Sequence, residues 1–137
     1  MTRVYMIRHG ETDWNKAHRL QGWSDIPLNE RGRAQAACAA KMMASVPLDV
    51  IYTSPLKRTV ETADIIRGER DIPVISEKGF IEINLGRWDG HSPDEMDELY
   101  PGQYGMIYGG ARPAMCTLTA GKALQPCRNG RGNLFFP

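Results

Sequence analysis

The feature that most constrains the fold is an alternation of short β-type runs with helix-forming segments in the first half of the chain. The β-branched and aromatic residues of 2–8 predict a first strand, which stops at Gly10. Good helix formers (Ala, Met, Gln, Lys) predict a helix over 33–45, with Asn29 as its N-cap and Pro47 ending it.

The alternation then repeats. Residues 49–53 predict a second strand, and Ser54-Pro55 is expected to cap a second helix that runs to about Arg67 and stops at Gly68. Three further elements are expected: a strand over 72–76, a glycine-punctuated loop over 79–90 and a short acidic helix over 93–100.

This order of elements is typical of an α/β domain with a largely parallel sheet. Ligands in such sheets bind beyond the carboxyl ends of the strands. The segments 8–12 and 54–58 follow the first two predicted strands, so we expect the functional residues there.

The residues in these segments suit phosphoryl chemistry. A histidine beside an arginine is more often structural, but His9 is accompanied by a glycine, a hydroxyl, an amide and the second arginine Arg58. The donors of an arginine match phosphate oxygens bidentately. A neutral imidazole among such donors can attack phosphorus and form a covalent intermediate. The departing alkoxide needs a proton, and Glu82 is the best candidate donor.

An ordered series of motifs resembles the histidine phosphatase superfamily, the phosphoglycerate-mutase-like proteins. The resemblance covers residues 2 to about 105, and it is closest in character to the small broad-specificity or α-ribazole-type phosphatases. It is carried by Arg8-His9-Gly10-Glu11-Thr12, Trp14-Asn15, Arg19-Leu20-Gln21-Gly22, Asp25-Ile26-Pro27-Leu28, Gly32 with Gln35-Ala36, Ser54-Pro55 with Arg58, Thr62-Ala63, Glu82-Ile83 and Gly86 with Trp88-Asp89-Gly90.

Membership would imply a role for each of eight residues. The resemblance makes His9 the phosphorylated nucleophile and Glu82 the proton donor. It places the other six around the substrate: Arg8, Asn15 and Arg58 on the phosphoryl group, and Thr12, Gln21 and Gly22 bordering the rest of the substrate. The resemblance implies neither a metal nor an organic cofactor. It implies a small phosphorylated metabolite as the partner.

The resemblance also implies a three-layer αβα fold with a largely parallel central sheet, incomplete at its C-terminal side. Residues 1–110 would form the N-terminal part of the histidine phosphatase domain. Family members carry a second catalytic histidine in their last third, whereas the histidines here are His9, His18 and His91.

Residues 111–137 form an atypical tail that we expect to be poorly ordered. All 16 acidic residues lie before it, and it holds four basic residues. The tail is typical of a frameshift. Residues 111–116 can be encoded as GCG-AGA-CCT-GCG-ATG-TGC, which reads Glu-Thr-Cys-Asp-Val two bases along.

The composition of the chain limits its expected partners and cellular location. A net charge of +1 gives no electrostatic reason to expect nucleic acid or an anionic membrane as partner. No run approaches the roughly 20 apolar residues of a membrane span, and the N-terminus lacks a signal peptide's apolar core. Three cysteines without metal-site spacing predict reduced thiols and a cytoplasmic protein. An exposed sheet edge would favour aggregation or a homodimer.

Two functions of different classes follow. The first is phosphomonoester hydrolysis or phosphoryl transfer through phosphohistidine. The resemblance favours phosphatase over mutase, since the mutases that resemble this family carry additional segments between the Arg58 region and the acid loop, and here only 24 positions separate Arg58 from Glu82. The second is a catalytically impaired truncated fragment or a phosphate-binding pseudoenzyme without the second histidine.

Overall fold

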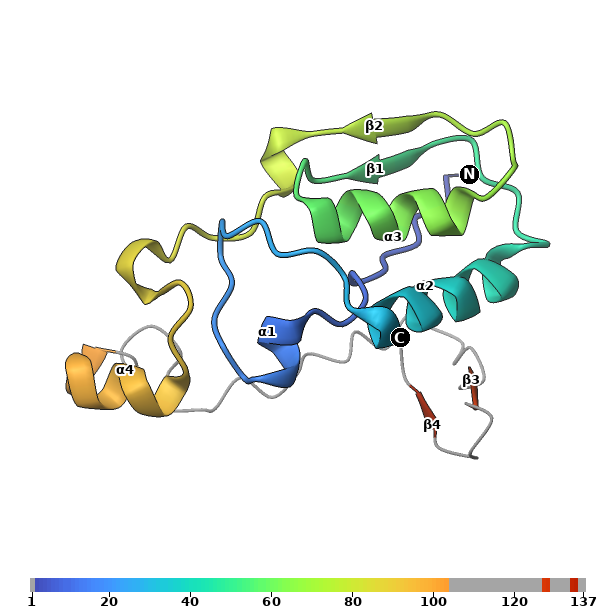
Figure 1. The fold of residues 1–137 in the computed structure, drawn as a ribbon. Coiled ribbons are helices and arrows are strands. Elements are labelled where there is room, and N and C mark those ends of the chain that lie inside the picture. Colours follow the sequence, from blue (N-terminus) through green and yellow to red (C-terminus); the bar gives the residue numbers. More distant parts are fainter. Residues whose placement is uncertain (1, 104–126, 129–133, 136–137) are drawn as a thin grey trace.

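The computed structural model describes residues 2–103, 127–128 and 134–135. Two short parallel strands, β1 (Ile51–Thr53) and β2 (Val74–Ser76), lie at one edge of the described part, with Ile51 opposite Val74 (Figure 1). Helix α3 (Lys57–Arg67) connects them and packs on both, and α2 (Glu30–Met43) packs on α3 (Figure 1). The predicted α/β class is therefore confirmed, and the described residues cover only part of the fold.

Helix α2 begins where the sequence predicts a cap. The side chain of Asn29 accepts a hydrogen bond of 2.8 Å from the amide of Gly32, which satisfies one of the free donors of the first turn. The helix itself begins at Glu30, three residues before the predicted Arg33, and ends at Met43. Its end is tied to α3 by Arg70, whose guanidinium donates to the carbonyl of Met43 at 3.0 Å.

The predicted start of the next helix is wrong. Helix α3 begins at Lys57, after Leu56, instead of at Ser54-Pro55. The Ser54 hydroxyl lies 2.7 Å from the hydroxyl of Thr59 and accepts from the amide of Leu56, so it is used within the turn before the helix. The predicted stop is confirmed, since Gly68 ends the helix with φ of +57°.

The predicted first strand is also wrong. Residues 2–8 form no strand, and in the described part of the chain β1 pairs only with β2. Val4 and Met6 are 79% and 70% exposed. A strand is defined by hydrogen bonds to a neighbour, and β propensity does not supply that neighbour.

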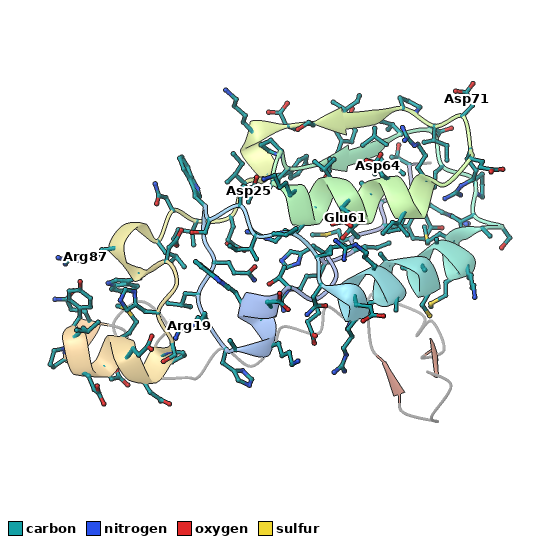
Figure 2. The ribbon with its side chains drawn as sticks, viewed as in Figure 1. Arg19, Asp25, Glu61, Asp64, Asp71 and Arg87 are labelled. Carbon is teal, nitrogen blue, oxygen red and sulfur yellow. The ribbon has the colours of Figure 1, made fainter. Side chains whose placement is uncertain are left out.

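Two apolar clusters hold the described part together. Ala39, Met43 and Ile66 pack between α2 and α3, and Ile51 of β1 packs against them. Trp88 and Met96 form the second cluster, which fixes α4 (Pro93–Leu99) against the preceding loop. Figure 2 shows Arg19 beside α4, where its guanidinium donates to both carboxylate oxygens of Glu95, at 3.1 and 3.2 Å.

The remaining expectations for this part of the chain are met in part. The acidic helix predicted over 93–100 is confirmed as α4, and the predicted loop over 79–90 includes two short 3₁₀ turns, η1 (Lys78–Phe80) and η2 (Gly86–Trp88). The expectation of three reduced thiols is wrong at Cys38, which is disulfide-bonded. It rested on an odd cysteine count without metal-site spacing, and an odd count still permits one bridge.

The atypical tail lies largely outside the described residues. Within it the structure describes an antiparallel pair, β3 (Cys127–Arg128) and β4 (Leu134–Phe135). None of the helices in the described ranges has the length and apolar character needed to cross a bilayer.

Candidate active site

A small pocket lies at the carboxyl ends of β1 and β2, where an α/β sheet binds its ligands. Its volume is about 170 Å³, and four of the residues selected from the sequence line it, with five neighbours: Arg8, His9, Arg58 and Glu82, together with Ile7, Ser54, Leu56, Thr59 and Phe80. The structure therefore brings together two arginines, a histidine and a carboxylate from three separate segments of the chain.

A larger and more open groove of about 720 Å³ lies along α3. Figure 2 shows Glu61 and Asp64, two of its lining residues, on that helix. It is lined by Pro27, Arg33, Pro55, Lys57, Val60, Glu61, Asp64 and Ile65. These residues include no histidine, cysteine or serine that could act as a nucleophile, so the smaller pocket is the better candidate for catalysis.

Close backbone contact fixes the position of His9. A Cβ atom at Gly10 would overlap the carbonyl oxygen of Gly32, at the start of α2, so only glycine allows this approach. The Gly10 amide donates to the Thr62 hydroxyl at 3.2 Å, and that hydroxyl donates to the carbonyl of Arg58 at 2.7 Å. Helices α2 and α3 therefore hold the loop that carries the histidine.

The hydrogen bond of the His9 ring defines its tautomer. Nδ1 lies 2.7 Å from the carbonyl oxygen of Gly10. A carbonyl oxygen only accepts, so Nδ1 must carry the proton. In the neutral ring Nε2 then holds the lone pair, and this nitrogen is the one that can attack an electrophile.

The electrostatic surroundings keep this ring neutral. Burial is the largest effect, and with the positive charges of Arg58 and Arg8 it lowers the pKa of His9 from its ordinary 6.5 to about 4. The Gly10 hydrogen bond and the Glu82 carboxylate act in the opposite direction, but more weakly in sum. At neutral pH the imidazole is therefore uncharged, with its lone pair on Nε2.

We expect the ring of His9 to titrate near pH 4 in an NMR experiment that follows imidazole chemical shifts. Arg8→Met should raise this pKa, because the Arg8 guanidinium lowers it. The pKa of His9 in the folded chain lies below its pKa in an unfolded chain. The contribution of His9 to the free energy of unfolding is therefore fully present above about pH 6.5 and is lost as the pH falls towards 4. A midpoint at or above 6.5 would contradict the assignment.

Arg58 is the buried cation of the pocket. Only 2% of it is exposed, and its Nη1 and Nη2 donate to the carbonyls of Ser24 and Gly22 at 2.7 and 2.9 Å. Burial lowers its pKa, which the carboxylates of Asp25, Glu82 and Asp89 partly offset. A guanidinium has five N–H donors, and Nε is buried with no described partner. Arg58 is held by two bonds and keeps donors for an anion.

Glu82 reaches the pocket from the loop after η1. Its carboxylate is exposed, and one oxygen accepts from the Ile83 amide at 3.0 Å. Its backbone carbonyl accepts from the indole Nε1 of Trp23 at 2.8 Å. The Trp23 bond thus fixes the backbone at Glu82, while the exposed carboxylate lies at the pocket.

Three of the other selected residues form a network beside the pocket. Thr12 is fully buried, and it caps the short helix α1 (Asp13–Lys16) together with Asn15 in a reciprocal capping box. The Thr12 hydroxyl also lies 2.7 Å from the side-chain oxygen of Gln21. Thr12, Asn15 and Gln21 do not line the pocket, and Gly22 takes part through its carbonyl bond to Arg58.

Sequence reasoning missed the residues that support the site from behind. Thr62 joins the His9 loop to α3, and Ser24 accepts from Arg58 through its carbonyl. Thr62 belongs to the motifs that resemble the family, but neither residue carries a sequence signal for this supporting role, because each acts through contacts between distant segments.

Comparisons with known proteins agree with this geometry. The chain belongs to the histidine phosphatase superfamily (branch 1), whose sequence profile matches residues 4–118. Phosphoserine phosphatase 1 of Hydrogenobacter thermophilus is 44% identical over 101 residues, 74% of this chain and 48% of that protein. The family resemblance predicted from the motifs is therefore confirmed.

Solved structures give the same result. YhfR of Bacillus stearothermophilus matches with a TM-score of 0.71 at 44% identity, over 74% of this chain and 50% of that one. The α-ribazole phosphatase of Shigella flexneri matches with a TM-score of 0.70 at 27% identity, over 79% of this chain and 54% of that one. The chain spans about half the length of the relatives it matches.

Proposed function

We propose that this chain hydrolyses phosphomonoesters of small metabolites through a phosphohistidine at His9. The observation that carries the proposal is the His9 ring, whose Nδ1 donates to the Gly10 carbonyl while two arginines and a carboxylate share its pocket. A neutral nucleophile beside fixed positive charge is what phosphoryl transfer needs, because catalysis there is mainly positioning and charge stabilisation.

The first step transfers the phosphoryl group to the protein. Arg8 and Arg58 neutralise the phosphoryl oxygens, and the lone pair on Nε2 of His9 attacks phosphorus. The N–P bond forms as the bond from phosphorus to the ester oxygen breaks. Glu82 gives its proton to that oxygen, so the leaving group departs as a neutral alcohol.

The second step releases phosphate. The Glu82 carboxylate takes a proton from water, and the water oxygen attacks the phosphorus of phosphohistidine. The P–N bond breaks, its electron pair returns to Nε2, and phosphate leaves. Glu82 and His9 regain their starting protonation states, so the cycle needs no further reactant.

Substrate class and reaction type rest on two supports. Two relatives carry the names phosphoserine phosphatase and α-ribazole phosphatase, and each name points to a small phosphorylated metabolite as substrate. The volume of about 170 Å³ suits a phosphoryl group with a small part of its ester. We propose hydrolysis in preference to transfer of the phosphoryl group to a second metabolite. We also propose that the protein is cytoplasmic, because such metabolites are made in the cytoplasm.

Turnover of p-nitrophenyl phosphate by the purified chain tests the function. Steady release of phosphate supports hydrolysis. The alternative, a phosphate-binding chain without turnover, is favoured by the absence of histidine after residue 91. It predicts binding of inorganic phosphate with no release of p-nitrophenol.

Glu82→Gln is expected to act mainly on substrates with poor leaving groups. It should lower turnover of an alkyl phosphate by about 100-fold, since general acids commonly contribute that much. An aryl phosphate needs little protonation and should lose far less. The matched control is Glu69→Gln, an exposed acid outside the pocket. Equal losses on both substrates would show that Glu82 is structural.

We also propose that the chain self-associates through the exposed apolar residues beside the sheet. Met6, Tyr52 and Phe80 are 70%, 56% and 60% exposed, and parallel sheets are normally covered on both faces. Sedimentation should show a concentration-dependent dimer, which Met6→Lys with Tyr52→Lys should weaken. A monomer at all concentrations would contradict this.

A further inference from the structure

The loop after Glu82 contacts the turn that holds Arg58 through a carboxylate that the reaction scheme does not use. Asp89 lies immediately after η2, and its Oδ2 accepts two hydrogen bonds from Ser24. The backbone amide of Ser24 donates at 3.0 Å and the Ser24 hydroxyl at 2.8 Å. Asp89 therefore fixes both the backbone and the side chain of that residue.

The same turn supplies the acceptors of Arg58. The carbonyls of Gly22 and Ser24 receive the two guanidinium bonds described above. A single residue, Ser24, thus accepts from Arg58 through its carbonyl and donates to Asp89 through its amide and hydroxyl. This gives a continuous hydrogen-bonded path from Asp89 to Arg58.

The turn is shaped to admit the carboxylate. Gly22 has φ of +42°, and a Cβ atom there would overlap Oδ1 of Asp89. That oxygen is buried and has no hydrogen-bond partner among the described residues. An unpartnered buried carboxylate oxygen is costly unless positive charge lies near. Arg58 supplies that charge, and Asp89 is among the carboxylates that stabilise its charged form.

We propose that Asp89 is a positioning residue for the phosphate clamp: its carboxylate fixes Ser24, and the turn at 22–24 in turn fixes the guanidinium of Arg58. Asp89 does not line the pocket, so it acts through Arg58 and not on substrate. The importance of Asp89 for catalysis rests on the proposed function, whereas its effect on the position of Arg58 does not.

The test compares Asp89→Ala with Asp89→Asn in the full chain. Asp89→Ala removes the oxygen that accepts both hydrogen bonds from Ser24. It should weaken binding of orthovanadate by about tenfold, as measured by calorimetry, because hydrogen bonds to a charged group have that effect. Asp89→Asn keeps an oxygen that can accept from Ser24 and should lose less than about threefold. The control is Asp71→Ala, an exposed acid before β2, at the opposite end of the sheet from η1 (Figure 2).

A second measurement needs no ligand. Arg58 lowers the pKa of His9, and Asp89 is not among the largest influences on that ring. Displacing Arg58 through Asp89→Ala should therefore raise the midpoint of the His9 titration, and Asp89→Asn should restore it towards the wild-type value. A residue that only stabilised the fold would change the melting temperature but not this midpoint.

Non-additivity completes the test. In an Arg58→Lys background, Asp89→Ala should weaken vanadate binding no further, because its effect passes through the missing guanidinium. If Asp89→Ala does not fold, Ser24→Ala replaces it, with a loss of about threefold expected in the same direction. Wild-type affinity together with an unchanged His9 midpoint in the folded variant would overturn the proposal, as would additive effects. Failure of wild type to bind vanadate would count against the proposed function, and the His9 midpoint would still decide the role of Asp89.

Discussion

His9→Ala is expected to abolish phosphoenzyme formation completely. The pocket brings one histidine to the two arginines, and the Nε2 lone pair of that ring is the nucleophile in the proposed scheme. Incubation with a ³²P-labelled phosphomonoester followed by rapid quenching should give an acid-labile, alkali-stable label on wild type. The alanine variant should carry none.

The matched controls are the two other histidines. His18→Ala and His91→Ala should both retain the label, because neither ring lines the pocket. Label that persists on the His9→Ala variant would contradict the assignment, as would its loss from a folded His18→Ala or His91→Ala protein.

Arg58→Ala is expected to combine a large functional loss with a loss of stability. Removing a charge-assisted donor from a phosphoryl pocket commonly costs on the order of 100-fold in rate. The substitution also leaves the carbonyls of Gly22 and Ser24 without their partner. Unpaired buried acceptors destabilise a fold by roughly 1–3 kcal/mol each, so urea unfolding should shift measurably to lower concentrations.

The matched control for Arg58→Ala is Arg8→Met. Arg8 is exposed and is described with no hydrogen bond to the backbone, so its loss should weaken vanadate binding without a comparable loss of stability. Arg58→Ala with wild-type stability would contradict the structural half of this account. Arg58→Ala with wild-type vanadate affinity would contradict the functional half.

Elements with local signals could be predicted from the sequence. Asn29 caps α2 and Gly68 ends α3 because both signals depend on a few neighbouring residues. The proline and acids that begin α4 act in the same local way. The family motifs likewise selected His9 and Arg58 for one site, and the structure brings both to the same pocket.

Features that depend on distant partners could not be predicted. Residues 2–8 have strand-forming side chains, yet pairing requires a neighbour that local sequence does not reveal. Thr12 was selected for substrate contact, whereas its hydroxyl lies inside the network with Asn15 and Gln21. The role of Asp89 depends on the loop at 82–90 meeting the turn at 22–24, and no spacing rule reports that contact.

The most direct test of the central claim is ³¹P and ¹⁵N NMR of the phosphorylated chain with ¹⁵N-labelled histidine. A carbonyl oxygen accepts the proton on Nδ1 of His9, which leaves Nε2 as the attacking atom. We expect one phosphohistidine, at residue 9, with phosphorus coupled to Nε2. Phosphorus on Nδ1, on another residue, or on no residue under conditions where phosphate is released would contradict it.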